Sequence, residues 1–158
     1  MAAPLNPDDL PRLLRPGMRI FVQGSVGLPG ALLHLLNGMA DKLGGLEFVS
    51  PLLPGVNAPE LSAGTAPSTF TTFFDYPLLQ QSWKAGPVVF KPSHYSEIAS
   101  WLGAASPIDI ALIQVAPADQ GGRYSLGIST DFVPDILPLC RTVIAQINSS
   151  WVTRVRRD

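Results

Sequence analysis

The chain has 158 residues, a formal net charge of −1 at pH 7, and 46% hydrophobic against 15% charged residues. This length predicts one domain with a core of its own, and the near-neutral charge does not favour nucleic acid as a partner. The charged share is below the usual value of roughly 25%. Either the domain has more apolar surface than its own fold can bury, as in half of a larger protein or an oligomer, or the composition is simply rich in Ala, Leu and Pro.

The sequence also indicates the cellular compartment in which the protein works. A single cysteine, Cys140, excludes an internal disulfide and fits a reducing environment. No apolar run is long enough to span a bilayer, and the start MAAPLNPDDLPRLL carries acids and prolines where a signal peptide has a basic start. We therefore expect a cytoplasmic protein with no membrane partner. One cysteine and two unlinked histidines, His34 and His94, do not predict a metal site.

In the first half of the chain, strands and helices are predicted to alternate. Residues 1–16 form a proline-rich lead with one helical turn at Asp8–Leu14. Pro29 suits the first turn of a helix. The elements that follow are a strand at Met18–Val22, a helix at Gly30–Leu43 closed by Gly44-Gly45, a strand at Leu46–Val49, a long loop at Ser50–Pro67 and a strand at Ser68–Phe74.

The second half continues this alternation. Ser96 is expected to be an N-cap, and Thr130 and Asp131 can cap the helix that begins at Phe132. The elements are a short helix at Tyr76–Lys84, a strand at Pro87–Lys91, a helix at Ser96–Leu102, a buried strand at Asp109–Val115, a second extended piece at Arg123–Gly127, a helix at Phe132–Cys140 interrupted by Pro134 and Pro138, and a strand at Arg141–Ile147.

This order predicts the fold class. A strand, a turn, a helix and a second strand imply a right-handed crossover between parallel strands. We therefore predict a three-layer α/β domain, with a mainly parallel open sheet and helices on both faces. It is expected to span residues 17–148, followed by a tail over residues 149–158.

The turn after the first strand is the first candidate site. A glycine turn between a strand and a helix presents backbone N–H groups that suit a carboxylate, phosphate or thioester oxygen. The turn is neither a P-loop nor a dinucleotide-binding motif, because the Lys-Ser/Thr pair and the glycine spacing are missing. The alternative is a tight βα turn without a ligand. The candidate residues are Gly24, Ser25, Val26, Gly27 and Pro29.

Two further loops carry candidate residues. His94 and Ser96 follow a strand, where a base or a carboxylate-binding group could lie, although loop packing or acyl-group contact is the favoured alternative. Asp119, Ser125 and Gly127, with Ser129, follow the strand Asp109–Val115 and could hold a carboxylate through hydroxyl and amide donors. The equal alternative is that Asp119 caps a turn and Ser125 satisfies the backbone. No GxSxG elbow is present.

Four segments in order resemble the N-terminal half of the acetyl-CoA hydrolase/transferase family, a branch of the class I CoA-transferases. They are IFVQGSVGLPGALL at Ile20–Leu33, KPSHYSEIASWL at Lys91–Leu102, ALIQVAPAD with the downstream YSLGIS, and RTVIAQIN at Arg141–Asn148. The resemblance implies that the turn with Gly24, Gly27 and Pro29 lines the active site. It also implies a loop with a serine at 96 and a loop with an acid at 119 and SLG at 125–127.

The resemblance implies CoA exchange between an acyl-CoA and a carboxylate through a glutamyl-CoA thioester. In that family the catalytic glutamate and a glycine-rich CoA-binding segment lie in a C-terminal half, which is absent here, and Glu47, Glu60 and Glu97 lie outside the family's catalytic context. We therefore expect this chain to be the N-terminal half of an acetyl-CoA hydrolase or CoA-transferase of acetate metabolism. It would be a truncated domain that has no catalytic residues and is inactive alone.

The expected ligands are an acyl-CoA thioester and a small carboxylate, with no bound cofactor. The expected protein partner is a complementary C-terminal half or a second copy. The alternative is a non-catalytic stand-alone domain that binds a small carboxylate or acyl-CoA, or only self-associates. The functional hypothesis requires that the glycine turn near residue 25 and the serine-bearing bend near residue 125 meet at one edge of the sheet.

Overall fold

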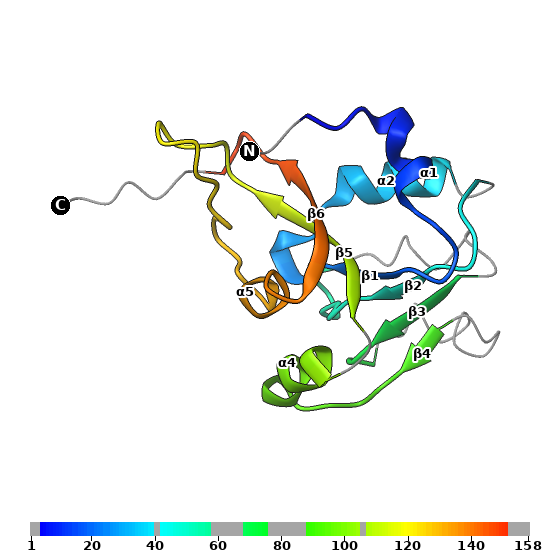
Figure 1. Ribbon diagram of the computed structural model, residues 1–158. Helices are drawn as coiled ribbons and strands as arrows, with labels where there is room; N and C mark the ends of the chain where they lie inside the picture. The colour runs from blue at the N-terminus through cyan, green and yellow to red at the C-terminus, as the bar shows by residue number, and fades with distance from the viewer. Residues whose placement is uncertain (1–3, 40–41, 58–67, 76–87, 105–106, 152–158) are drawn as a thin grey trace.

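The computed structural model of the chain describes residues 4–39, 42–57, 68–75, 88–104 and 107–151 (Figure 1). Within these residues the strands form one parallel sheet of six strands in the order β4-β3-β2-β1-β5-β6. The strands are β1 (Arg19–Val22), β2 (Glu47–Val49), β3 (Thr69–Thr72), β4 (Val88–Phe90), β5 (Ile108–Val115) and β6 (Cys140–Ile147). The predicted parallel sheet is confirmed.

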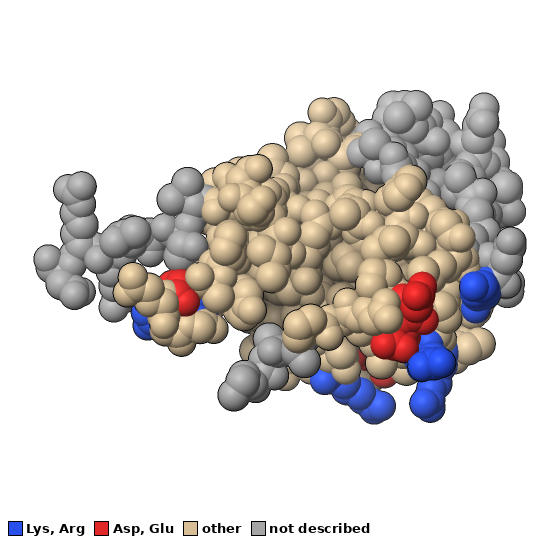
Figure 2. Space-filling view, turned by 90° about the horizontal axis from the view of Figure 1, so that it is seen from above, with Lys and Arg blue, Asp and Glu red and all other residues tan. Residues whose placement is uncertain are grey.

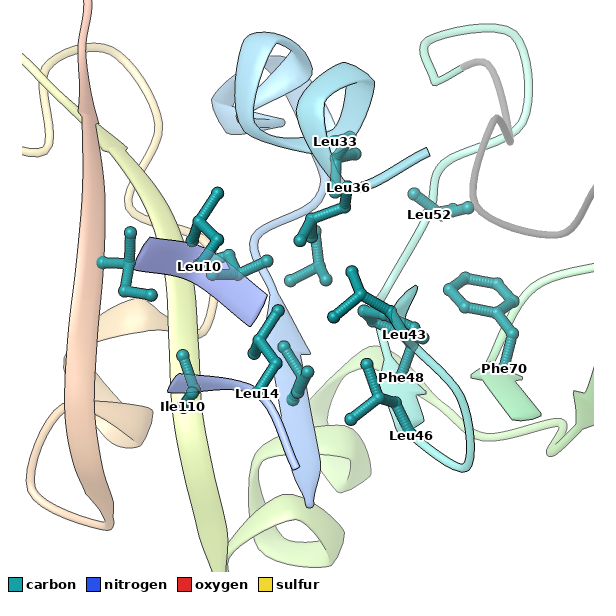
Figure 3. Close-up of a cluster of buried hydrophobic side chains, with 14 of the residues drawn as sticks. Leu10, Leu14, Leu33, Leu36, Leu43, Leu46, Phe48, Leu52, Phe70 and Ile110 are labelled. Atoms are coloured by element: carbon teal, nitrogen blue, oxygen red, sulfur yellow. The ribbon is translucent and has the colours of Figure 1, made fainter. Parts of the chain in front are cut away.

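Helices cover both faces of the sheet, as predicted for a three-layer α/β fold (Figure 1). On one face, α1 and α2 bury leucines against β1, β2 and β5, and Figure 3 shows this cluster. On the other face, α4 and α5 bury Ile98, Leu102, Val133 and Ile136. The helices are α1 (Leu10–Leu13), α2 (Gly30–Gly38), α4 (Tyr95–Ala104) and α5 (Val133–Ile136), with 3-10 turns η1 (Pro7–Asp9) and η2 (Ser25–Gly27).

The order of the strands contains one reversal. The chain runs outward from β1 through β2 and β3 to β4, and then returns to place β5 on the other side of β1. In open parallel sheets, ligands bind outside the carboxyl ends of the strands at such a reversal. The carboxyl ends of β1 and β5 are therefore the position that the fold itself singles out.

The helix predicted over Gly30–Leu43 is shorter than expected, because α2 ends at Gly38. Asn37 and Gly38 are both poor helix formers, and the N–H of Met39 closes the last turn onto the carbonyl of Leu36. Gly44-Gly45 therefore does not close this helix. Gly45 instead adopts a φ of +69° and accepts a hydrogen bond from the N–H of Gly17.

The start of α4 also differs from the prediction. Ser96 is not the N-cap, because the helix begins at Tyr95 and His94 precedes it. The carbonyl of His94 accepts from the N–H of Glu97, and the Glu97 carboxylate accepts in return from the N–H of His94 at 3.2 Å. The bond from the His94 N–H to the Glu97 carboxylate is one half of a capping box. It fixes the start of the helix at Tyr95, one residue before Ser96.

Four predictions between residues 76 and 140 need comment. The helix predicted over Phe132–Cys140 is wrong beyond Ile136, because Pro138 cannot continue it and β6 begins at Cys140. Phe132, rather than Thr130 or Asp131, occupies the N-cap position of α5. The extended piece Arg123–Gly127 does not form a strand. The helix predicted at Tyr76–Lys84 lies outside the described residues.

Two properties bear on the predicted function classes. No helix within the described ranges combines the length and the apolar character needed to cross a membrane. The same ranges contain no group of three or more His, Cys, Asp or Glu side chains that could hold a metal ion.

The packing of α2 on the sheet predicts a clear stability effect. Leu36 is 1% exposed in the α2-side cluster, so Leu36→Ala should lower the free energy of unfolding by about 3 kcal/mol through lost burial and the cavity left behind. Leu13→Ala, at a side chain that is 38% exposed, is the matched control and should cost under about 1 kcal/mol. Equal losses in urea unfolding would contradict this placement of α2.

Candidate functional site

A buried glutamine organises the carboxyl ends of β1 and β5. Gln23 follows β1, and its side chain is fully buried. Its Nε2 donates to the carbonyl of Ser129 at 3.0 Å, and its Oε1 accepts from the backbone N–H of Gln114 in β5 at 2.8 Å. Both ends of the amide are therefore satisfied, as a buried polar group requires. This side chain brings the segment around Ser129 against the end of β1.

The network extends to β6 and α2. Gln146 in β6 donates from Nε2 to Oε1 of Gln114 at 2.7 Å. Its Oε1 accepts from the backbone N–H groups of Ala31 at 2.9 Å and Leu32 at 3.2 Å, in the first turn of α2. A side chain from a distant strand thus caps this helix. The N-terminal donors that could have served an anionic ligand are already used within the protein.

The glycine turn is fixed by the same kind of contact. The N–H of Gly24 donates to Oδ2 of Asp131 at 3.2 Å. The N–H of Ser25 donates to Oδ1 of Asn57 at 3.0 Å, and Nδ2 of Asn57 donates back to the carbonyl of Ser25 at 2.6 Å. The N–H of Gly27 donates to the carbonyl of Gly24. Three backbone donors of this turn, those of Gly24, Ser25 and Gly27, are therefore engaged internally.

Both glycines of this turn are required by close packing. A Cβ at position 24 would meet the backbone carbonyl of Pro51, and one at position 27 would meet the side chain of Gln23. Pro29 is buried, whereas Val26 is 51% exposed. The turn is therefore a rigid support that presents Val26 to the outside.

The loop before α4 reaches the same place through Tyr95. Its hydroxyl donates to Oδ1 of Asp131 at 2.9 Å, and its ring lies 4.5 Å from the ring of Phe132 between centroids. His94 and Ser96 flank Tyr95 and are exposed. Sequence reasoning singled out these two neighbours and missed Tyr95. It also treated Asp131 only as a helix cap.

The third group of candidates lies in a hairpin-like loop. Asp119 accepts from the backbone N–H groups of Gly121 at 2.8 Å and Arg123 at 2.9 Å, and forms an ion pair with Arg123 at 2.9 Å. These hydrogen bonds, chiefly the one from the Arg123 backbone, lower the pKa of Asp119. In this structure Asp119 caps a turn.

Ser125 and Gly127 occupy the returning arm of that loop. The hydroxyl of Ser125 accepts from the N–H of Gly127 at 3.1 Å, and the carbonyl of Ser125 accepts from the N–H of Ala116. Gly127 has a φ of +63° and lies against the ring of Trp151. The glycine turn thus meets the bend that follows Ser125, and Ser129 and Asp131 make the hydrogen bonds that join them.

Asp131 and Tyr95 form the most strongly perturbed pair at this edge. Burial raises the pKa of Asp131, and hydrogen bonds from Tyr95, Gly24 and Phe132 partly oppose this. Burial, followed by the hydrogen bond and the charge of Asp131, raises the pKa of Tyr95 to about 12. At neutral pH the phenol is therefore protonated and donates to the carboxyl group.

Comparisons with known proteins give the chain a family. The sequence pattern of the acetyl-CoA hydrolase/transferase N-terminal domain matches residues 5–157. A 4-hydroxybutyrate coenzyme A transferase from Clostridium kluyveri is 26% identical over 133 residues, which make up 84% of this chain and 31% of the relative.

Solved structures show the same fold. RipA from Yersinia pestis is similar with a TM-score of 0.74 and 20% identity, covering 90% of this chain and 36% of RipA. A 4-hydroxybutyrate CoA-transferase from Porphyromonas gingivalis is similar with a TM-score of 0.64 and 18% identity, covering 92% and 33%. The chain thus spans about a third of the length of these relatives.

The glutamine network predicts a large cost for an apolar replacement of similar size. Gln23→Met should leave the N–H of Gln114 and the carbonyl of Ser129 buried and unpaired, which costs about 2–4 kcal/mol of unfolding free energy. Gln120→Met, on an exposed loop, is the matched control and should cost nearly nothing. Chemical denaturation measures both, and a tolerated Gln23→Met would refute the structural role of this amide.

The glycine turn gives a second prediction. Gly24→Ala places a methyl group against the backbone of Pro51, which cannot swing away as a side chain can, and should cost about 2 kcal/mol. At Gly30 nothing lies within 4 Å of the added Cβ, so Gly30→Ala should be neutral or stabilising. Thermal melting compares the two variants. If they melt alike, the close approach of Gly24 to Pro51 is wrong.

Proposed function

This chain belongs to the family of acetyl-CoA hydrolase/transferase N-terminal domains, and we propose that it forms part of the substrate pocket of an acetyl-CoA hydrolase or an acyl-CoA:carboxylate CoA-transferase. Its ligands are a coenzyme A thioester and a small carboxylate. The observation that carries the proposal is the convergence of the glycine turn, Tyr95 and Asp131 at the strand-order reversal between β1 and β5.

The proposed pocket wall has two parts. The turn with Gly24, Ser25, Gly27 and Pro29 supports Val26, and the start of α4 contributes His94 and Ser96 beside Tyr95. Because the amides of Gly24, Ser25 and Gly27 are engaged internally, the proposal gives the main ligand contacts to exposed side chains. Asp119, Ser125 and Gly127 shape the loop that delivers Ser129 and Asp131 to the site.

The proposal assigns the catalytic carboxylate to a complementary half. Glu47 pairs with Arg19 at 3.1 Å at the amino end of the sheet, away from the site, and Glu97 caps the start of α4. Glu60 lies outside the described residues. Covalent catalysis through a glutamyl-CoA thioester would therefore use a glutamate from another segment, and this chain alone would not exchange CoA.

The surface supports a protein partner. β6 is an edge strand, and on one face Val143 and Ile147 are 42% and 56% exposed. Figure 2 shows charged side chains at the left end and along the lower centre and right edge of the view, and a broad surface above and between them that carries none. An open edge with apolar side chains suits either a complementary half or a second copy. The alternative function is a stand-alone domain that binds the ligand or only self-associates. In that case, self-association would use this same β6 surface.

The test measures ligand binding by the chain itself. Acetyl-CoA should raise the melting temperature, because a ligand that binds only the folded state stabilises it, whereas CoA-free buffer should not. Val26→Asp should weaken this shift, since it places a negative charge on the pocket wall beside an anionic ligand. Val89→Asp on β4 is the control at a similar exposure of 48%. Absence of any shift at about 1 mM acetyl-CoA would refute the proposed pocket.

A second assay decides between the two functions. The chain is mixed with the part of the Clostridium kluyveri transferase that lies beyond the matched segment, and thioester exchange is measured. We expect exchange in the mixture and none with the chain alone. Exchange by the chain alone would contradict the assignment of the carboxylate to a second segment. An inactive mixture with retained acetyl-CoA binding would favour the stand-alone binding domain.

A further inference from the structure

Asp131 is the residue on which the two loops of the site converge. One carboxylate oxygen, Oδ2, accepts from the N–H of Gly24, and the other, Oδ1, accepts from the hydroxyl of Tyr95. Gly24 begins the turn after β1, and Tyr95 begins α4, so a single side chain joins two loops that are otherwise far apart in the sequence. Because each donor uses a different oxygen, an amide side chain, which has one oxygen, could accept only one of these two hydrogen bonds.

The backbone at this point is held in a conformation that side-chain-bearing residues rarely adopt. Asp131 has a φ of +44°, and Ser25, next to its partner Gly24, has a φ of +54°. Left-handed conformations at such residues persist only where the surrounding contacts enforce them, and they cluster at functional sites. Here the enforcing contacts are the ones that tie Gly24 to Asp131 and Ser25 to Asn57.

We propose that Asp131 is a positioning residue of the acyl-CoA site, which fixes the glycine turn relative to Tyr95 and engages the Tyr95 proton, so that the phenolic oxygen meets the ligand only as a hydrogen-bond acceptor. This inference rests on the proposed function. The ligand chemistry that fits an acceptor at this place is a hydrogen-bond donor, such as an amide N–H of the acyl-CoA arm. The Tyr95 residue is 52% exposed, which leaves it accessible to such a group.

The electrostatics of the pair agree with this role. Tyr95 is the titratable side chain that contacts the Asp131 carboxyl group within the described part of the chain. Its hydrogen bond favours the charged carboxylate and therefore opposes the upward pKa shift that burial imposes. Removing the phenolic hydroxyl must then raise the pKa of Asp131 further. A purely structural contact through the ring would not change this pKa in that direction.

The test follows the Gly24 amide by NMR while pH is varied between about 3 and 8. In the wild-type chain the Gly24 proton shift should titrate with a midpoint above the ordinary value for aspartate. Asp131→Asn should abolish this titration. Asp135→Asn, on the exposed side of α5, removes the same charge and should leave it unchanged. A Gly24 amide that ignores pH in the folded wild-type chain would overturn the proposal.

Two phenol variants test the second contact. Tyr95→Phe keeps the ring against Phe132 and should raise the Gly24 titration midpoint, whereas Tyr124→Phe, at a similar exposure of 47%, should not. An unchanged midpoint in Tyr95→Phe would overturn the coupling.

Acetyl-CoA affinity separates this inference from the proposed function. Asp131→Asn should weaken binding about tenfold, the change that corresponds to one hydrogen bond, and Asp135→Asn should bind as the wild type does. If the wild type binds and Asp131→Asn binds equally well, Asp131 does not position the site. If the wild type fails to bind while its Gly24 amide titrates as expected, the proposed function is wrong and the coupling of the two loops stands.

Discussion

The buried amide of Gln23 is the contact on which the rest of the site depends. It satisfies a backbone donor in β5 and a backbone acceptor at Ser129 at once, and leaving either unpaired in the interior would cost about 1–3 kcal/mol. The loop that follows β5 is therefore drawn back over the end of β1. Asp131 lies two residues beyond Ser129 and reaches Gly24 for that reason. Gln114 and Gln146 extend the same constraint to β6 and α2.

The strands and their parallel order could be predicted from the sequence, because short runs of branched apolar residues separated by turns leave few alternatives. Residues such as Phe21 and Ile113 are buried by the layers that this pattern requires. The helix ends were harder. Gly38 ends α2, although the apolar pattern continues to Leu43. Leu43 is only 3% exposed, so it is a core residue, but it does not belong to the helix. Pattern alone does not distinguish a helical core residue from one that follows the helix.

The candidate site was only partly predictable, and the reason is sequence separation. The glycine turn could be singled out as a candidate because glycine and proline act locally. The contacts of Gln23 with Ser129 and of Asp131 with Gly24 join positions about a hundred residues apart, so no local pattern signals them. Tyr95 was passed over in favour of its neighbours His94 and Ser96, since a tyrosine at a helix start has no special local meaning. The predicted use of turn amides for a ligand stays a prediction, and two of those amides, at Gly24 and Ser25, donate to the distant side chains of Asp131 and Asn57.

The carboxyl ends of β1 and β5 therefore form a preorganised edge, in which the amides of Gly24, Ser25 and Gly27 are engaged internally, and the proposed function places exposed side chains of this edge against the ligand. The most direct measurement is an amide shift map of the isotope-labelled chain on addition of acetyl-CoA. If the proposed site is right, the largest changes fall on residues 24–29 and 129–131, at the carboxyl ends of β1 and β5, and on residues 94–96 at the start of α4. Changes confined to β4 or to the amino ends of the strands, or no changes at saturating ligand, would contradict it.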